Sequence, residues 1–242
     1  MRFVLDLSDA RMQVLLGLLL REGRAVSALE GFDFDEPAAL LLSPSQRSEG
    51  QKATLEKLRP GSVVFAPWAQ SEAIEGLVWH DLGANEEYAL QNAFLTAEGA
   101  LKLLIEHSDF SLRGAEMLLL GYGRIGSCLV ELLRPFAAKI FLREKSEERF
   151  ALAKERGLEP WTGQAVRLIV GTSPEAALKW EEAARFSCNS LYLELASPPG
   201  GLIEGSFSGK TLRAPGLPGR ISPHSAAEGL LVCLRGVAPE LF

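Results

Sequence analysis

The chain has 242 residues, 47% of them hydrophobic and 23% charged, which is enough for one large or two small domains with a buried core. Its net charge of −6 excludes an overall basic surface of the kind that binds nucleic acid. The longest apolar stretch, Val14–Leu20, is too short to cross a bilayer, and Met1 leads straight into a strand-like run instead of a signal peptide. We therefore expect a cytoplasmic protein that contacts neither membrane nor nucleic acid.

The first ninety residues alternate short apolar runs with helical patterns, which predicts a small parallel-sheet domain. The expected strands are Phe3–Leu7, Arg24–Leu29, Ala39–Leu42 and Val63–Ala66. A helix presents Met12, Leu15 and Leu19 on one face and ends at Gly23. The polar segment Ser43–Gly50 and a short helix over Ala53–Leu58 lie between the later strands.

A longer helix is expected over Thr96–His107, with Thr96 as its N-cap and Ala97, Ala100, Leu101 and Leu104 on its apolar face. We expect this helix to join two lobes, and the loop Ser108–Gly114 to lead into the next strand.

The second lobe shows five apolar strands, each followed by a loop rich in Gly, Ser or Pro. The strands are Met117–Leu120, Lys139–Leu142, Leu168–Val170, Leu191–Leu195 and Thr211–Ala214. The loops are Gly121–Gly126, Arg143–Ser146, Gly171–Pro174, Ala196–Gly201 and Pro215–Arg220. In an open parallel sheet these loops meet at the carboxyl edge, where ligands bind. Good turn formers are also common in such loops without any ligand.

The motif Gly121-Tyr122-Gly123-Arg124-Ile125-Gly126 follows the apolar strand Met117–Leu120 and opens a helix. The first glycine allows a tight turn, the second lets the backbone approach a pyrophosphate, and the third lets helix and strand pack closely. The apolar positions Cys128, Leu129, Leu132 and Leu133 continue at helical spacing. The context predicts a dinucleotide site, whereas a bare glycine turn that binds nothing is the alternative.

The residues about twenty positions after the glycines indicate which dinucleotide binds, because an acidic side chain there holds the NAD ribose and a basic one accommodates the NADP 2′-phosphate. This chain has Arg143-Glu144-Lys145-Ser146. Arg143, Lys145 and Ser146 favour NADP, since a phosphate dianion prefers a guanidinium fork and further donors. Glu144 keeps NAD as the alternative, because a shift of one residue would put its carboxylate at the ribose.

The cysteines Cys128, Cys188 and Cys233 lie far apart without metal-site spacing, so we expect no metal. Cys128 and Cys233 sit on helical apolar patterns and are expected to be buried thiols in a reducing compartment. The last helix begins at Ser222-Pro223, an N-cap followed by a proline at the first helical position.

Several further motifs make the chain resemble the A subunit of dipicolinate synthase. They are Asp9-Ala10-Arg11, Gly31-Phe32-Asp33, Asn92 with Thr96–Ala100, Asp109-Phe110, Leu195–Gly201 and Ala214–Gly219, together with the glycine motif. That family makes pyridine-2,6-dicarboxylate for bacterial spores beside a second, flavoprotein-like subunit. Its members are longer, chiefly in the first half, so this chain resembles a short member. It departs from them at Ser8, Glu194 and His224, where the family tends to have Gly, Asp and Lys.

The resemblance implies an α/β fold with two lobes, like that of 2-hydroxyacid and formate dehydrogenases. A smaller flavodoxin-like domain (residues 1–95 with a returning helix at 221–242) would precede a doubly wound Rossmann-type domain (residues 96–220). It also implies an NADP-dependent oxidoreductase subunit, homo-oligomeric and paired with a flavoprotein like the second subunit of dipicolinate synthase. The substrate would be dihydrodipicolinate or its hydroxytetrahydro precursor.

Such a substrate needs partners for two carboxylates and a destination for a proton. Arg11, Arg213 and Arg220 are the carboxylate candidates, with the backbone of Gly200 and Gly216.

His224 is the acid–base candidate, because the helix dipole at its position disfavours imidazolium and keeps a neutral base. Ser197 is the second catalytic candidate, as a hydrogen-bonding partner of the substrate or of the nicotinamide amide. Thr172, Ser173 and Ala196 are expected beside the nicotinamide half of the cofactor. The alternative interpretations are a dehydrogenase of another small carboxylate and an NADP-binding regulatory protein without catalysis.

Overall fold

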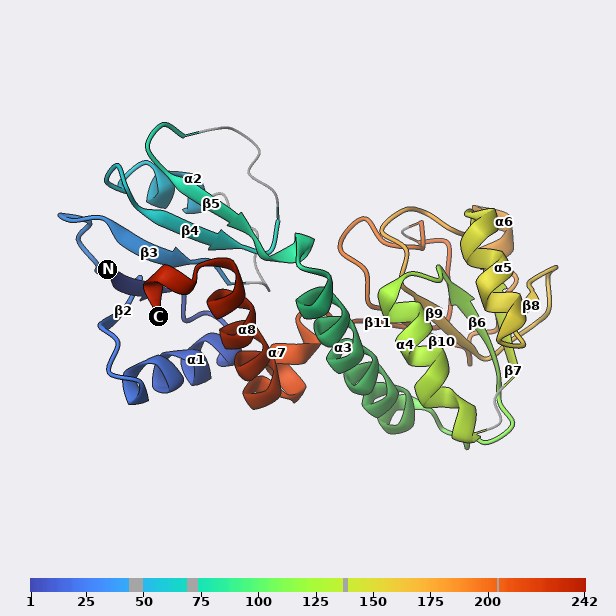
Figure 1. Cartoon of the computed structure of the whole chain (residues 1–242). Coiled ribbons are helices and arrows are strands. Elements are labelled where there is room, and N and C mark those ends of the chain that lie inside the picture. The colour runs from blue at the N-terminus through green and yellow to red at the C-terminus, as the bar shows by residue number, and fades with distance from the viewer. Residues whose placement is uncertain (44–49, 69–73, 137–138, 204) are drawn as a thin grey trace. The chain divides into compact units, whose positions relative to one another are not determined.

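The computed structural model describes residues 1–43, 50–68, 74–136, 139–203 and 205–242, so most of the expected segment Ser43–Gly50 lies outside the described residues. The chain forms two compact units (Figure 1). Unit 1 comprises Met1–Asn92 and Pro218–Phe242, and unit 2 comprises Ala93–Leu217.

Unit 1 is built on a five-stranded parallel sheet in the order β2-β1-β3-β4-β5. The strands are β1 (Arg2–Leu5), β2 (Val26–Ala28), β3 (Ala38–Leu41), β4 (Val63–Ala66) and β5 (Val78–Asp81). The predicted parallel sheet is confirmed. The edge strand β5 was not predicted, because its sequence Val-Trp-His-Asp is partly exposed and shows no apolar period.

Two buried clusters cover the two faces of this sheet, since successive side chains of a strand point to opposite sides. Phe3, Leu5 and Phe65 pack with helices α1 (Ala10–Arg21) and α8 (Pro223–Val237). On the other face of the sheet, Val4 packs with Leu55 of α2 (Gly50–Leu55) and with Leu58. The C-terminal helix is thus part of the core of unit 1. A short helix α7 (Leu217–Ile221) forms where the sequence predicted only a loop.

Helix α3 (Glu86–His107) begins ten residues before the predicted start at Thr96. Asn85 accepts a hydrogen bond from the Tyr88 N–H at 2.9 Å, and Glu86 and Glu87 occupy the first turn, where negative charge is favourable. Thr96 lies buried in the middle of the helix, 6% exposed. The helix is therefore capped at Asn85 and not at Thr96.

Unit 2 carries a six-stranded parallel sheet in the order β11-β10-β9-β6-β7-β8. The strands are β6 (Glu116–Leu120), β7 (Lys139–Arg143), β8 (Glu159–Pro160), β9 (Leu168–Gly171), β10 (Leu191–Glu194) and β11 (Lys210–Arg213). Besides the C-terminal part of α3, this unit contains the helices α4 (Arg124–Leu133), α5 (Glu147–Glu155) and α6 (Trp180–Ala183). The predicted Rossmann-type sheet is confirmed, and the order reverses at β6, which lies between β7 and β9.

Cys128 and Cys233 are buried, as predicted, and Cys188 is exposed. Burial raises the pKa of the Cys233 thiol to about 11, so that thiol stays protonated at neutral pH.

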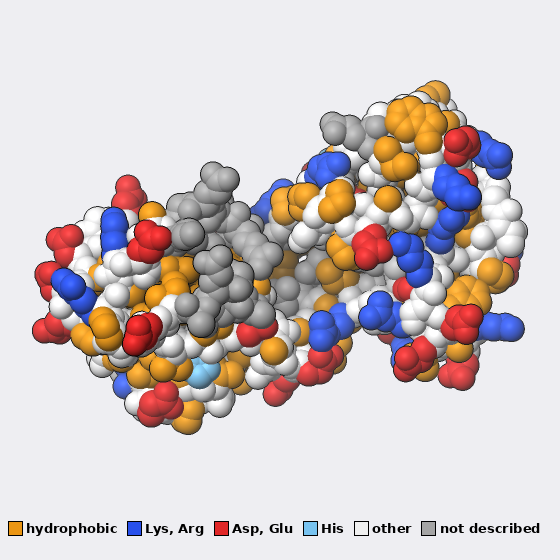
Figure 2. Space-filling view, turned by 90° about the horizontal axis from the view of Figure 1, so that it is seen from above, with side chains coloured by type: hydrophobic (Ala, Val, Ile, Leu, Met, Phe, Trp, Pro, Cys, Tyr) orange, Lys and Arg blue, Asp and Glu red, His pale blue; other side chains and the backbone are white. Residues whose placement is uncertain are grey.

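No helix of the described residues is long and apolar enough to cross a membrane. Figure 2 shows acidic and basic side chains interspersed on the face in view, rather than a field of one sign.

Candidate dinucleotide-binding site

The register of the unit 2 sheet places five strand ends in one row. Leu120 of β6 is paired with Arg143 of β7 on one side and with Gly171 of β9 on the other. Glu194 of β10 is paired with Gly171 and with Arg213 of β11. The loops that follow these strands therefore start from one edge of the sheet, at a topological switch point of the kind where ligands bind.

The three glycines of the motif have different surroundings. Gly121 has a φ of +95°, and a Cβ there would lie 2.9 Å from Thr172 Oγ1. A Cβ on Gly126 would lie 2.6 Å from the Gly121 carbonyl oxygen. Gly123 precedes α4, and no atom lies within 4 Å of the position its Cβ would take. The loop is thus closely packed at its two ends and open in the middle, where a pyrophosphate would approach the start of the helix.

A cavity of about 930 Å³ opens beside this loop. Its lining includes Gly121 and Gly123, the segment Arg143–Ser146 and the segment Thr172–Lys179. The cavity thus lies along the loops that follow β6, β7 and β9. Its position and its glycine lining fit a dinucleotide.

Glu144, directly after β7, is held against the glycine loop. Its Oε2 accepts the Tyr122 N–H at 2.7 Å, and its Oε1 accepts the N–H groups of Lys145 and Ser146 at 2.8 and 2.9 Å. Burial alone would raise the pKa of this carboxyl, but the three N–H donors outweigh it and hold the pKa below its usual range. The site therefore contains a fixed carboxylate at the end of the second strand.

The basic neighbours of Glu144 already have acidic partners. Arg143 Nη1 lies 2.7 Å from Glu182 Oε1, and Lys145 Nζ lies 2.8 Å from Glu175 Oε2. Ser146 is the N-cap of α5, where its hydroxyl accepts the Arg149 N–H at 3.3 Å. The residues expected to bind a 2′-phosphate line the cavity, but Arg143 is paired with the partly buried Glu182 and Lys145 with the exposed Glu175.

Thr172, expected beside the nicotinamide ribose, lines the cavity and also makes contacts within the protein. Its hydroxyl lies 3.1 Å from the Leu120 carbonyl oxygen and 3.0 Å from that of Gly121. The hydroxyl donates to these carbonyls and so ties β9 to the end of β6. The Ser173 hydroxyl accepts the Glu175 N–H at 3.4 Å, within its own loop.

The loop after β10 carries Ala196, Ser197 and Gly200. Ser197 is exposed, whereas Gly200 is buried with a φ of +84°. Beneath the loop lies Glu194, 3% exposed, whose carboxylate accepts the Ala196 N–H. In the sequence Glu194 stood out only as a departure from a family pattern, and nothing local indicates these contacts.

The remaining candidates are divided between the units. Arg213 is exposed at the end of β11, and Gly216 has a φ of +65°. In unit 1, His224 is exposed in the first turn of α8, and Arg220 is exposed on α7.

Arg11 differs from the expectation of an accessible carboxylate binder, because it is buried, 2% exposed. Its guanidinium lies 3.1 Å from Asn92 Oδ1, 3.2 Å from the Tyr88 hydroxyl and 3.5 Å from Asp9 Oδ2. Arg11 therefore has internal partners on three sides within unit 1.

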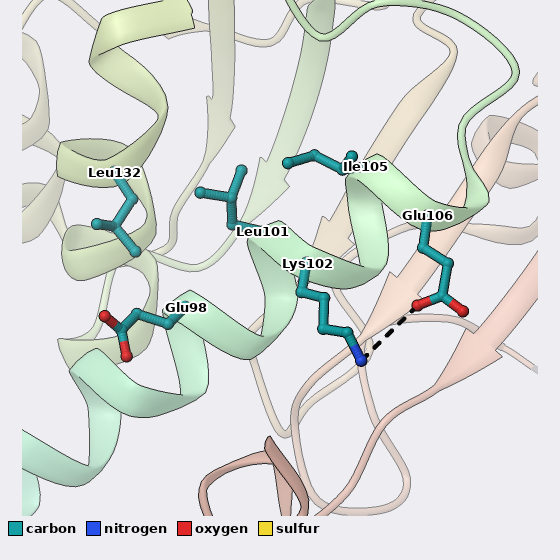
Figure 3. Close-up of a pocket in the computed structure, with 6 residues that line it drawn as sticks. All are labelled: Glu98, Leu101, Lys102, Ile105, Glu106 and Leu132. Carbon is teal, nitrogen blue, oxygen red and sulfur yellow. Dashed lines mark ion pairs between the residues drawn. The ribbon is translucent and has the colours of Figure 1, made fainter. Parts of the chain in front are cut away.

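A second cavity, of about 540 Å³, lies between α3 and α4 (Figure 3). Leu101, Ile105 and Leu132 form its apolar part, and Lys102 and Glu106 pair at 4.0 Å along its edge. None of the glycine-motif residues line it, so it is separate from the candidate dinucleotide site.

No protein-family model matches the chain. The A subunit of dipicolinate synthase from Bacillus subtilis (strain 168) is 28% identical over 166 residues, which are 64% of this chain and 56% of that protein. The chain is similar to this dipicolinate synthase component. The resemblance inferred from the motifs is confirmed, although the alignment spans little more than half of that relative.

Solved structures confirm the fold. The A chain of dipicolinate synthase from Bacillus subtilis has a TM-score of 0.79 at 22% identity, covering 100% of this chain and 96% of that one. The corresponding protein from Bacillus halodurans has a TM-score of 0.83 at 23% identity, covering 99% and 97%. D-lactate dehydrogenase from Escherichia coli has a TM-score of 0.62 at 11% identity, covering 99% and 96%. This chain therefore has the same fold as the two dipicolinate synthase structures and D-lactate dehydrogenase.

Proposed function

We propose that this chain is a nicotinamide-dinucleotide-dependent oxidoreductase with the role of the dipicolinate synthase A subunit. The observation that carries the proposal is the 930 Å³ cavity beside the glycine loop, open at Gly123 and bounded by the strand ends of unit 2. When bound, a nicotinamide dinucleotide would accept or deliver a hydride. The backbone of Gly121–Gly126 and the start of α4 would hold the pyrophosphate, and the Glu144 carboxylate would accept hydrogen bonds from the adenosine ribose.

The contacts around Glu144 support NAD(H) over NADP(H), although the basic sequence Arg143–Lys145 favoured NADP. A 2′-phosphate dianion would have to approach a fixed carboxylate, and it would compete with Glu182 and Glu175 for the two cations. The phosphate and the Glu144 carboxylate would repel each other, and such repulsion is unfavourable even near a protein surface. A ribose hydroxyl, in contrast, is a donor that the carboxylate can accept.

We expect the wild-type protein to bind NADH roughly tenfold more tightly than NADPH, a difference of about 1.4 kcal/mol. Glu144→Ala removes both the ribose acceptor and the repulsion, so it should weaken NADH binding and strengthen NADPH binding. Isothermal titration calorimetry with both nucleotides measures this change. Glu148→Ala, which removes an exposed glutamate that lines the same cavity, is the matched control and should leave the preference unchanged. Tighter binding of NADPH by the wild type would restore the NADP assignment.

The proposed reaction is the oxidation of dihydrodipicolinate to dipicolinate. A bound nicotinamide in its oxidised form would supply the hydride acceptor, a base or solvent would take the one proton that the ring also loses, and aromatisation would make the oxidation favourable. The protein's task is then mainly to orient the ring and bind its carboxylates. Arg213 as a carboxylate partner belongs to this proposal. Arg213→Gln tests it, and this variant should lower turnover while leaving NADH affinity intact.

The test of the function is a coupled assay, run with and without the flavoprotein-like second subunit of a dipicolinate synthase. The protein is mixed with the product of dihydrodipicolinate synthase, and NAD(P)H absorbance and the ultraviolet spectrum of dipicolinate are followed. Formation of dipicolinate with stoichiometric NADH supports the proposal. Turnover of an unrelated 2-keto acid alone would favour a dehydrogenase of another carboxylate. Nucleotide binding without turnover, whether or not the second subunit is added, would favour a regulatory protein.

A further inference from the structure

We propose that Glu194 is a positioning residue, which fixes the Ala196–Gly201 loop from below and through it the nicotinamide side of the site. The link between this loop and the cofactor rests on the proposed function. The contacts themselves lie wholly within unit 2.

The Glu194 carboxylate bonds to both ends of the loop. Its Oε1 accepts the Ala196 N–H at 3.1 Å, and its Oε2 accepts the Gly201 N–H at 2.8 Å. A single side chain at the end of β10 thus joins the first and last residues of a six-residue segment. The exposed hydroxyl of Ser197 is carried on the segment between them.

A third donor completes this arrangement. The Tyr192 hydroxyl, two residues earlier on the same face of β10, lies 2.5 Å from Glu194 Oε2. Burial, together with the neighbouring Glu194 carboxylate, raises the pKa of Tyr192 far above its usual range, so the phenol stays protonated and donates. Hydrogen bonds to a charged acceptor are the strong ones, and three of them compensate a buried carboxylate.

The carboxylate lies against two glycines, and a Cβ at either position would approach it too closely. A Cβ on Gly200 would collide with Glu194 Oε2, and a Cβ on Gly171, at the end of β9, would lie 2.7 Å from Oε1. The carboxylate therefore lies close to Gly171 at the end of β9 and to Gly200 in the loop that follows β10. These strands lie on the opposite side of β6 from β7 and Glu144. In a doubly wound sheet the two halves of a dinucleotide lie on opposite sides of the switch point, so the Glu194 loop belongs to the nicotinamide half.

Glu194→Gln is the decisive change, because it keeps the size of the side chain but turns one acceptor into a donor. The glutamine amide would face the N–H groups of Ala196 and Gly201 and the Tyr192 hydroxyl, which are all donors. Its NH₂ group cannot accept a hydrogen bond from them, so one end of the loop loses its partner. NADH carries the nicotinamide, whereas ADP-ribose has the same adenosine and pyrophosphate without it. We expect the variant to bind NADH roughly tenfold more weakly and ADP-ribose with unchanged affinity. Calorimetry with these two ligands provides the measurement.

Glu159→Gln on the exposed strand β8 is the matched control and should change neither affinity. Hydrogen exchange gives a readout that needs no cofactor: the amides of Ala196 and Gly201 should exchange faster in Glu194→Gln, while the β10 amides stay protected. Should that variant fail to fold, Tyr192→Phe removes a single donor and should shift the same readouts in the same direction.

Parallel weakening of NADH and ADP-ribose, or unchanged affinities with unchanged exchange, would overturn the positioning role. Failure of the wild type to bind either ligand would instead overturn the proposed function, and faster exchange at Ala196 and Gly201 in the variant would still establish the loop contact.

Discussion

Gly123→Glu should abolish dinucleotide binding, with affinity reduced by more than roughly a hundredfold, while the fold is retained. Gly123 stands at the open centre of the glycine loop, with no atom within 4 Å of its Cβ position. Its φ of −82° is one that any residue adopts, so the new side chain causes no backbone strain. The glutamate would place bulk and negative charge where a pyrophosphate must approach the start of α4. Electrostatic repulsion and steric exclusion by this one side chain would thus prevent the pyrophosphate from contacting the start of α4.

Calorimetry with NADH and thermal unfolding of the same sample together check this prediction. Gly17→Glu on α1 is the matched control, because Gly17 also has nothing within 4 Å and belongs to unit 1. It adds the same side chain and charge, and should bind NADH like the wild type. Normal NADH binding by a folded Gly123→Glu protein would show that the cavity beside the glycine loop is not the dinucleotide site.

Arg11→Met should destabilise unit 1 by about 3–5 kcal/mol, the usual cost of leaving a buried charge without its partner. The side chains of Arg11 and Asp9 are only 2% and 4% exposed, and the guanidinium also bonds to Tyr88 and Asn92. Methionine fills much of the same space but cannot neutralise Asp9 or donate to its neighbours. The first helix and the start of α3 would thereby lose a shared polar contact.

Urea denaturation followed by circular dichroism measures this loss. Lys139→Met removes one partner of an exposed pair, in which Lys139 Nζ lies 3.2 Å from Glu159 Oε2, and is the control. Exposed pairs contribute about 0–1 kcal/mol, so the midpoint should barely move. If Arg11→Met costs no more than this control, Arg11 is not a structural residue, and its assignment as a carboxylate binder gains support.

The features that the sequence predicted well are local ones. The run Met117–Leu120, the glycines of the following turn and the apolar spacing from Cys128 to Leu133 lie within seventeen consecutive residues. The sequences of β6, β7, β9 and β10 each contain an apolar run followed by turn formers, whereas β11 (Lys-Thr-Leu-Arg) is largely exposed. Buried parallel strands need no partner to be recognised, because their hydrophobicity is continuous.

The start of α3 was predicted from a competing local signal, and that prediction was wrong. Thr96 is an acceptable N-cap in isolation, but the cap at Asn85 lies upstream and the helix continues through Thr96 without interruption. At the end of β7, Arg143, Glu144 and Lys145 are adjacent in sequence, and composition alone favours the two basic residues. The Tyr122 N–H of the glycine loop bonds to the Glu144 carboxylate, a contact that no local pattern indicates and that supports our proposal of NAD(H), while NADP(H) stays the alternative.

The sequence by itself indicated most strands of both sheets, the glycine turn and the chain's resemblance to a dehydrogenase-like family, since these follow from residue types at short spacing. Strand β5 and helix α7, in contrast, appeared only in the structure. Only the tertiary structure decided that Arg11 is buried against Tyr88 and Asn92, that Thr172 ties two strands together, and that Glu194 holds both ends of its loop. Most of these contacts join residues that are distant in the chain, and all depend on which face each side chain occupies. A charge or hydroxyl becomes a ligand or a structural element according to the partners that folding brings to it, and no local pattern encodes them.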